Sequence, residues 1–216
     1  LRTIVPPASD MQRLALIGQP LVPFQRVAEH LRGIGAQTLL LQDSVRDPDF
    51  LAEHEAFYSK QHRVISHLCS RLHAFAAPMR AQVEGEALGA RAVLDFLDNL
   101  AEPSRQYLGF VTFRPLRHAP VGASILIPAH VCDVTCHECF PVHIAGKDFQ
   151  VCGTPYLQQD NAVGACAQAS IWIALRTQMK RVGNTAYNPA DLTRAATRYV
   201  ALDRVFPGRQ GLVIEQ

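Results

Sequence analysis

Three apolar segments lie in the middle of the chain. They are YLGFVTFRPL (107–116), ASILIP (123–128) and HIAGKDFQVCG (143–153), and the last resembles a hairpin that turns near Gly146 and Lys147. A turn as short as the one in this hairpin joins antiparallel strands, because a parallel pair needs a long crossover. The centre of the chain therefore predicts antiparallel strands, and the mixed order of elements favours an α+β fold over a doubly wound sheet.

Helical patterns lie on both sides of this centre. Before it we expect short strands at 14–17 and 38–41 with a helix near 24–31, a helical segment over 50–75 that follows the capping pair Asp47-Pro48, and a helix over 91–100. After it, helical patterns run from Gly164 to about Arg181 and again from Asn188. We predict a mostly helical region over 1–100 and a strand-rich segment with the last helices over 101–216.

The composition narrows the class of protein. The chain has 216 residues, of which 48% are hydrophobic and 19% are charged, and this composition is typical of a globular protein. Its net charge of +2 is too small to indicate a nucleic-acid partner. No apolar run is long enough for a bilayer, and the first residues do not follow the order of a signal peptide. We therefore expect a cytoplasmic protein with free thiols, no membrane association and an undefined oligomeric state.

The segment QQDNAVGACAQASIWIAL (158–175) carries the strongest chemical signal. Gly164-Ala165-Cys166 stands at the predicted start of a helix, where free N–H groups and the helix dipole stabilise a thiolate. Small residues at 164, 165, 167 and 169 let a substrate chain approach. A glutamine just upstream and the Cys166 backbone N–H are suitable donors for a developing oxyanion. Cys166 is therefore the candidate nucleophile.

This segment resembles the papain-like cysteine peptidases, in an uncharacterised bacterial branch. Gln158 or Gln159, Gly164 and Cys166 match the family's glutamine and helix-initiating cysteine, with the glutamines eight and seven residues before the cysteine. The resemblance implies a papain-like core behind an extra N-terminal helical region. It also implies an acyl-enzyme at Cys166, oxyanion stabilisation by Gln158 or Gln159, a protein or peptide substrate and no required cofactor. A related deamidase or acyltransferase would use the same nucleophile.

The general base is not defined by this segment. All nine histidines precede Cys166, whereas the papain-like order places the histidine downstream. In one alternative the histidine follows Gln216 in a longer chain. In the second, a permuted order supplies His143 or, next, His130. In the third, Cys166 is a buried structural thiol, and the protein is a catalytically inactive papain-like interaction module.

A second cysteine cluster lies in HVCDVTCHECFPVH (130–143). Cys132, Cys136 and Cys139 with His143 or His130 would complete a tetrahedral site for a structural zinc ion. The same spacing also resembles the cluster motif of radical SAM enzymes, and the third interpretation is a reduced loop without metal. A zinc site would make a zinc-stabilised interaction module the alternative function. At the end of the first central strand, Arg114 favours a structural salt bridge over carboxylate binding.

Overall fold

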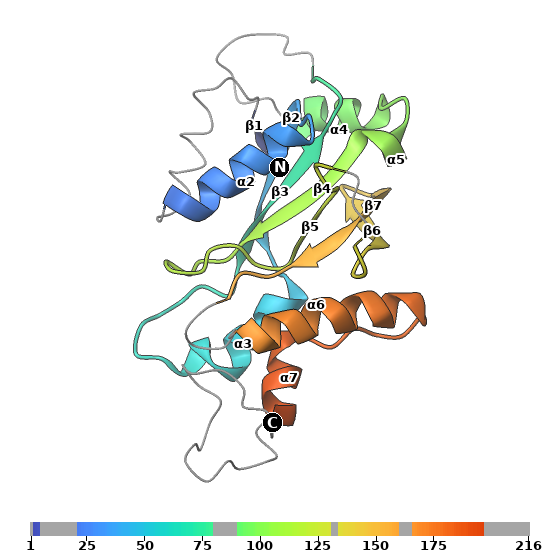
Figure 1. Ribbon diagram of the computed structural model, residues 1–216. Helices are drawn as coiled ribbons and strands as arrows, with labels where there is room; N and C mark the ends of the chain where they lie inside the picture. Colours follow the sequence, from blue (N-terminus) through green and yellow to red (C-terminus); the bar gives the residue numbers. More distant parts are fainter. Residues whose placement is uncertain (1, 5–20, 80–89, 131–133, 160–165, 197–216) are drawn as a thin grey trace.

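The chain folds around one antiparallel sheet of seven strands in the order β1-β2-β3-β4-β5-β7-β6 (Figure 1). The computed structural model describes residues 2–4, 21–79, 90–130, 134–159 and 166–196. The strands are β1 (Arg2–Ile4), β2 (Thr38–Val45), β3 (Cys69–Phe75), β4 (Tyr107–Phe113), β5 (Ser124–Leu126), β6 (Glu138–Ile144) and β7 (Lys147–Tyr156). Strands that follow one another in the sequence pair with each other from β1 to β5 and again between β6 and β7.

The helices cover the sheet and form a group beyond one of its ends. They are α2 (Leu21–Gly33), α3 (Pro48–Ala56), the 3₁₀ helix η2 (Tyr58–Lys60), α4 (Ala90–Asp98), α5 (Pro103–Gln106), α6 (Cys166–Arg181) and α7 (Pro189–Ala196). In Figure 1, α2 lies along the sheet, α4 and α5 lie at its upper end, and α3, α6 and α7 gather below it. Within the described ranges, no helix has the length and apolar character needed to cross a bilayer.

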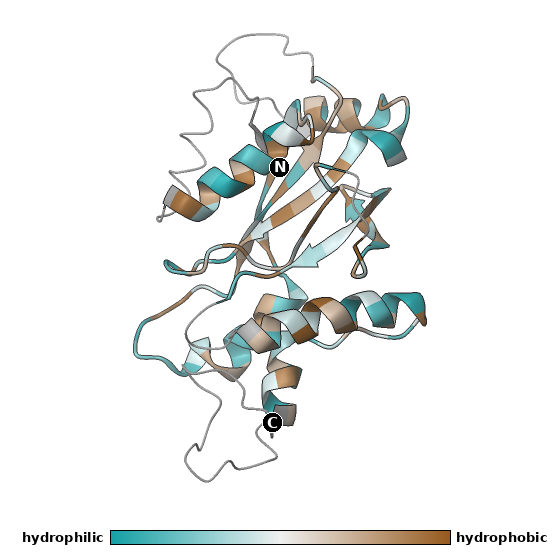
Figure 2. Ribbon diagram, viewed as in Figure 1, coloured by the Kyte–Doolittle hydropathy of each residue, from teal (hydrophilic) through white to brown (hydrophobic). Residues whose placement is uncertain are grey.

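Alternating side chains of the central strands feed two hydrophobic clusters. Leu39, Leu41 and Leu72 pack with Phe24 and Leu31 of α2 on one side of the sheet. Their neighbours, which include Leu40 and Phe75, pack with α4 and with the β6–β7 hairpin on the other side. Strand β4 is buried along its whole length because both of its faces are covered. Figure 2 shows the result as hydrophobic colouring along the central strands and hydrophilic colouring at the outer end of α6.

The sheet curves so that its last strands fold over its first ones. The Phe149 ring of β7 lies 5.7 Å from the Phe75 ring and 5.2 Å from the Tyr107 ring, measured between centroids. Gly109 of β4 and Gly153 of β7 flank β5 and let its backbone approach theirs closely. A Cβ atom on Gly109 would lie 2.2 Å from the Ile125 carbonyl oxygen, and one on Gly153 would lie 2.2 Å from the Leu126 carbonyl oxygen.

The β6–β7 hairpin turns through Ala145 and Gly146, which both have positive φ values of 49° and 80°, as a tight two-residue turn requires. Its register pairs Ile144 with Lys147 and, five residues further out, Cys139 with Cys152. These two cysteines form a disulfide. The expectation that the cysteines are all free thiols is therefore wrong for this pair.

The structure confirms the α+β class and the antiparallel centre. It also shows two errors in the expected organisation. The segment 50–75 is not one helix, because α3 ends at Ala56 and residues 69–75 form β3 between β2 and β4. In addition, β3 pairs directly with β4, so the regions 1–100 and 101–216 share one sheet. The strand expected at 14–17 lies outside the described residues.

Candidate functional site

Helix α6 begins at Cys166, as the sequence predicts. The helix spans 16 residues, has no acidic residue in its first turn and carries Lys180 and Arg181 in its last. This distribution suits the helix dipole, whose positive end lies at the residue where the cysteine stands. One turn later, Ala169 is buried and Ser170 is exposed. The Cys166 side chain itself lies outside the described part of the structure.

Helix α6 is fixed by polar contacts with α3. The Trp172 indole N–H donates to Asp49 Oδ1 at 3.3 Å, and Arg176 Nη1 donates to Asp49 Oδ2 at 2.7 Å. The Arg176 guanidinium also lies 4.9 Å from the centre of the Trp172 ring. Burial raises the pKa of Asp49 above its ordinary value, although Arg176 acts in the opposite direction. Trp172 is therefore a core residue, and it joins α6 to α3.

A second contact fixes α6 against α7. Gln168, which is buried, donates from Nε2 to Thr193 Oγ1 at 3.0 Å. The Thr193 hydroxyl in turn donates to the Pro189 carbonyl at 3.2 Å, at the start of α7. Because Gln168 stands only two residues after Cys166, this contact holds the first turn of α6.

Gln158 is held by two hydrogen bonds to the backbone of Val121. The Val121 N–H donates to Gln158 Oε1 at 3.0 Å, and the Gln158 N–H donates to the Val121 carbonyl at 3.1 Å. The carboxamide oxygen is therefore engaged, and the NH₂ group is the donor that this side chain can offer to a ligand. Gln159 is exposed. The distance from either glutamine to the Cys166 thiol depends on a side chain outside the described residues.

A buried ion pair anchors the backbone that leads toward Cys166. Arg114 and Glu53 are both 1% exposed and lie 3.0 Å apart. Arg114 Nη2 also donates to the Gln158 carbonyl at 2.8 Å, and the guanidinium donates twice to the Ala119 carbonyl. This confirms the structural salt bridge expected for Arg114, and it connects α3 with the residues just before the nucleophile segment.

The sequence did not reveal that buried carboxylates of α3 and its cap pair with arginines from other elements. Besides Glu53 and Asp49, the cap residue Asp47 accepts from the Phe50 N–H at 3.0 Å and pairs with Arg71 at 2.6 Å. Three buried acids on one short helix thus bind arginines from β3, from α6 and from the end of β4. The acidic residues at positions 47, 49 and 53 are visible in the sequence, but their spacing does not distinguish buried carboxylates from solvated ones.

His143 lies far from the start of α6. It pairs with Asp148 at the tip of the β6–β7 hairpin, where Lys147 pairs with Asp98 of α4. The other end of β6 is held by Arg181, the last residue of α6, and α6 is about 22 Å long from its first to its last residue. Because β6 runs from the Arg181 end of α6 to the hairpin tip beside α4, the structure does not bring His143 to the start of α6. His130 lies exposed after β5.

The described residues do not assemble the expected zinc set. Cys139 is bonded to Cys152, and a disulfide sulfur is not the thiolate that zinc needs. Cys136 is a free, partly exposed thiol, His143 is paired with Asp148, and Cys132 lies outside the described residues. Within the described ranges, no three His, Cys, Asp or Glu side chains form a group that could hold a metal ion.

An open cavity of about 450 Å³ reaches Gln158 from between α2 and the sheet. Its lining is mostly apolar and includes Val27 of α2, Leu126 of β5 and Tyr156 of β7. His30 contributes an imidazole whose Nε2 lies 3.0 Å from the Ile127 carbonyl oxygen. The cavity therefore offers an apolar space beside the glutamine.

Comparison with known proteins adds no further constraint. The chain matches no protein-family model, no curated protein and no solved structure.

Proposed function

We propose that the protein is a thiol-dependent hydrolase or acyltransferase that forms an acyl-enzyme at Cys166. The observation that carries the proposal is that a 16-residue helix begins at this cysteine. Unpaired N–H groups at a helix start favour the thiolate over the thiol, and the thiolate is the attacking form. The thiolate adds to a substrate carbonyl, and collapse of the tetrahedral intermediate expels the amine and leaves a thioester.

Gln158 is the candidate oxyanion donor whose contacts the structure describes. Its carboxamide oxygen is held by Val121 and its carbonyl by Arg114, so its NH₂ group has a fixed position. A fixed donor stabilises a developing oxyanion without reorganisation, and loss of one such donor typically lowers the rate about 100- to 1,000-fold. The Cys166 backbone N–H is the second donor in this proposal.

The protein substrate and the papain-like core are the finer parts of the proposal. Both are supported by the glutamine–cysteine segment and by the α+β architecture. The apolar cavity beside Gln158 would accept an apolar substrate group. The expectation of a cytoplasmic location is not carried forward, because disulfides such as Cys139–Cys152 are typical of oxidising compartments. None of the described histidines is assigned as the base.

The first test is the pH dependence of Cys166 alkylation by iodoacetamide, read by mass spectrometry. Cys69 is the internal control, because burial raises its pKa to about 12 and it is 2% exposed. We expect Cys166 to react with an apparent pKa well below the value of about 8.5 for an ordinary cysteine. If Cys166 reacts no faster than Cys69 in the folded protein, the enzyme proposal fails and an inactive interaction module replaces it.

The second test separates the two glutamines. Gln158→Glu keeps an oxygen that can accept from the Val121 N–H but removes the NH₂ donor, and Gln159→Glu is the matched control. We expect Gln158→Glu to slow acylation of Cys166 by p-nitrophenyl acetate about 100-fold, with the acyl group located by mass spectrometry. Equal rates in wild type and Gln158→Glu would remove this residue from the oxyanion site.

A further inference from the structure

The β6–β7 hairpin and the loop before it bring three cysteines into one small region. Cys139 and Cys152 form the disulfide between the two strands, and both residues are partly exposed. Cys136 stands three residues before Cys139 as a free, partly exposed thiol. Three residues of chain span at most about 10 Å. A thiol and a disulfide, both in contact with solvent, are therefore held within a short reach of each other.

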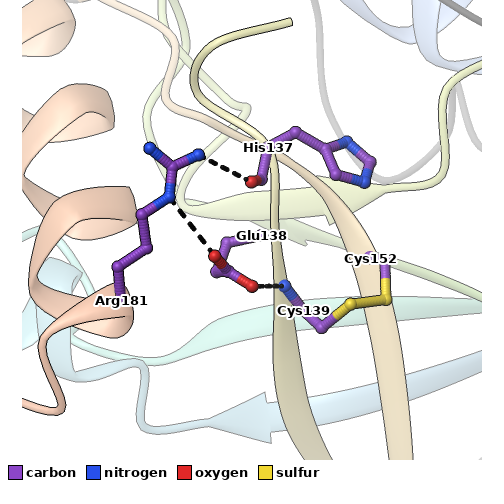
Figure 3. Close-up of a disulfide and its surroundings, with 5 residues drawn as sticks. All are labelled: His137, Glu138, Cys139, Cys152 and Arg181. Atoms are coloured by element: carbon purple, nitrogen blue, oxygen red, sulfur yellow. Dashed lines mark hydrogen bonds and ion pairs between the residues drawn. A yellow bond between two sulfur atoms is a disulfide. The ribbon is translucent and has the colours of Figure 1, made fainter.

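Arg181 fixes the backbone on both sides of Cys136. Its Nη2 donates to the Thr135 carbonyl at 2.7 Å and to the His137 carbonyl at 3.2 Å. Its Nε donates to Glu138 Oε2 at 3.3 Å, and Glu138 Oε1 accepts from the Cys139 N–H at 3.0 Å (Figure 3). One guanidinium at the end of α6 thus positions the whole Cys136–Cys139 segment, including the backbone of the disulfide cysteine.

We propose that Cys136, Cys139 and Cys152 form an intramolecular thiol–disulfide exchange site. The Cys136 thiolate attacks the Cys139 sulfur, the Cys136–Cys139 bond forms, and the Cys139–Cys152 bond breaks. Cys152 leaves as a thiolate and takes up the proton that Cys136 lost. The reaction changes no oxidation state overall, so it needs no external oxidant or reductant.

The two products of this exchange link different parts of the molecule. The Cys139–Cys152 bond joins β6 to β7, whereas a Cys136–Cys139 bond closes a four-residue C-x-x-C loop at the start of β6. C-x-x-C is a spacing at which proteins form reversible disulfides. The exchange would therefore move the covalent link from the hairpin to the loop held by Arg181, and would expose a thiol at Cys152 on the strand that leads toward Gln158.

Tryptic mapping distinguishes the two bonds directly. Cleavage after Arg117, Lys147 and Arg176 yields one peptide, 118–147, with Cys132, Cys136 and Cys139, and a second, 148–176, with Cys152 and Cys166. The Cys139–Cys152 bond joins the two peptides, whereas a Cys136–Cys139 bond lies within the first. The oxidised full-length protein is incubated at pH 8, quenched with acid and N-ethylmaleimide, and digested without reductant.

We expect wild type to show both peptide topologies, with alkylated Cys152 at least tenfold more abundant than in Cys136→Ser. Cys132→Ser, four residues earlier in the sequence than Cys136, is the matched control and should behave like wild type. In Arg181→Met the exchange should be slower, because the carbonyls on both sides of Cys136 lose their donor. Urea unfolding of each variant confirms that it is folded. The proposal is overturned if Cys152 is equally protected in wild type and Cys136→Ser, or if Cys132→Ser alone abolishes the exchange.

Discussion

His73 is a neutral histidine in the hydrophobic core. It is fully buried in β3, and desolvation lowers its pKa to about 3. A neutral imidazole has one donor and one acceptor. Its Nε2 donates to Gln42 Oε1 at 3.3 Å, and the Tyr107 hydroxyl, whose pKa burial raises, donates to Nδ1 at 3.0 Å. The residue thus satisfies two polar neighbours without carrying a charge.

The depressed pKa of His73 makes stability depend on pH. The unfolded chain binds this proton near pH 6.5 and the folded protein only near pH 3, so the stability is complete above pH 6.5 and is lost as the pH falls between these values. The expected slope is about 1.4 kcal/mol per pH unit. Urea unfolding of wild type and His73→Gln from pH 7.5 to 4.5 measures this slope. The difference in the free energy of unfolding between the two proteins should shrink as the pH falls.

The control is a substitution in the same strand that removes apolar packing but no titratable group. Leu72→Ala, at the neighbouring position of β3, should lower the free energy of unfolding by about 2–5 kcal/mol by the same amount at every pH. If the difference between wild type and His73→Gln also stays constant with pH, His73 is not the titrating group.

Strand β3 shows why the helical prediction for 50–75 failed. Its residues Leu72, His73, Ala74 and Phe75 are all buried, because β2 and β4 flank it and both of its faces are covered. A strand of this kind lacks the alternation of polar and apolar residues by which strands are recognised. Helix α4, which keeps one solvated face, was predicted near its observed position, whereas β6 was expected only from His143 onward.

The disulfide was within reach of the sequence. The hairpin was predicted over 143–153, with its turn near Gly146 and Lys147. Counting five residues outward from the Ile144–Lys147 pair places Cys139 opposite Cys152, and residues opposite each other in an antiparallel pair lie close together. The register of the turn was the signal, and it was overlooked because the cysteine spacing was interpreted as a metal motif.

Strand β5 lies close to the backbone of Gly109 in β4 and of Gly153 in β7. In Gly153→Ala the added Cβ would lie 2.2 Å from the Leu126 carbonyl oxygen, which is backbone and cannot rotate away. We expect the free energy of unfolding to fall by about 2–3 kcal/mol. Urea denaturation measures this loss.

Gly33→Ala, at the end of α2, is the matched substitution. Its Cβ would meet the Ala129 Cβ at 3.7 Å, an ordinary contact, so the change should stay within about 1 kcal/mol. Equal stability of the two variants would show that β5 does not pass as closely as the structure indicates.

The Glu53–Arg114 pair joins parts of the molecule that are distant in sequence. Through it α3 contacts the end of β4 and the Gln158 carbonyl. A single replacement that leaves one buried charge without its partner is more harmful than loss of both. The candidate site therefore depends on residues that no local motif contains, which is why the sequence located Cys166 but not its support.

Arg114→Met should destabilise the protein by about 3–5 kcal/mol. The double variant Glu53→Met/Arg114→Met should recover part of this loss, because neither charge then remains buried alone. Thermal or urea unfolding of wild type, both single variants and the double variant gives the coupling energy. Strictly additive effects would mean that the two side chains do not interact.

The outer strand β6 has a consequence for self-association. Ile144 and Lys147 close the two-residue turn as a hydrogen-bonded pair, so the backbone groups of Cys139, Pro141 and His143 point away from β7. The Cys139 N–H donates to the Glu138 carboxylate, and Pro141 has no N–H. Two of these three positions therefore offer no donor to an incoming strand. The edge is protected against the strand-to-strand aggregation to which open sheets are prone.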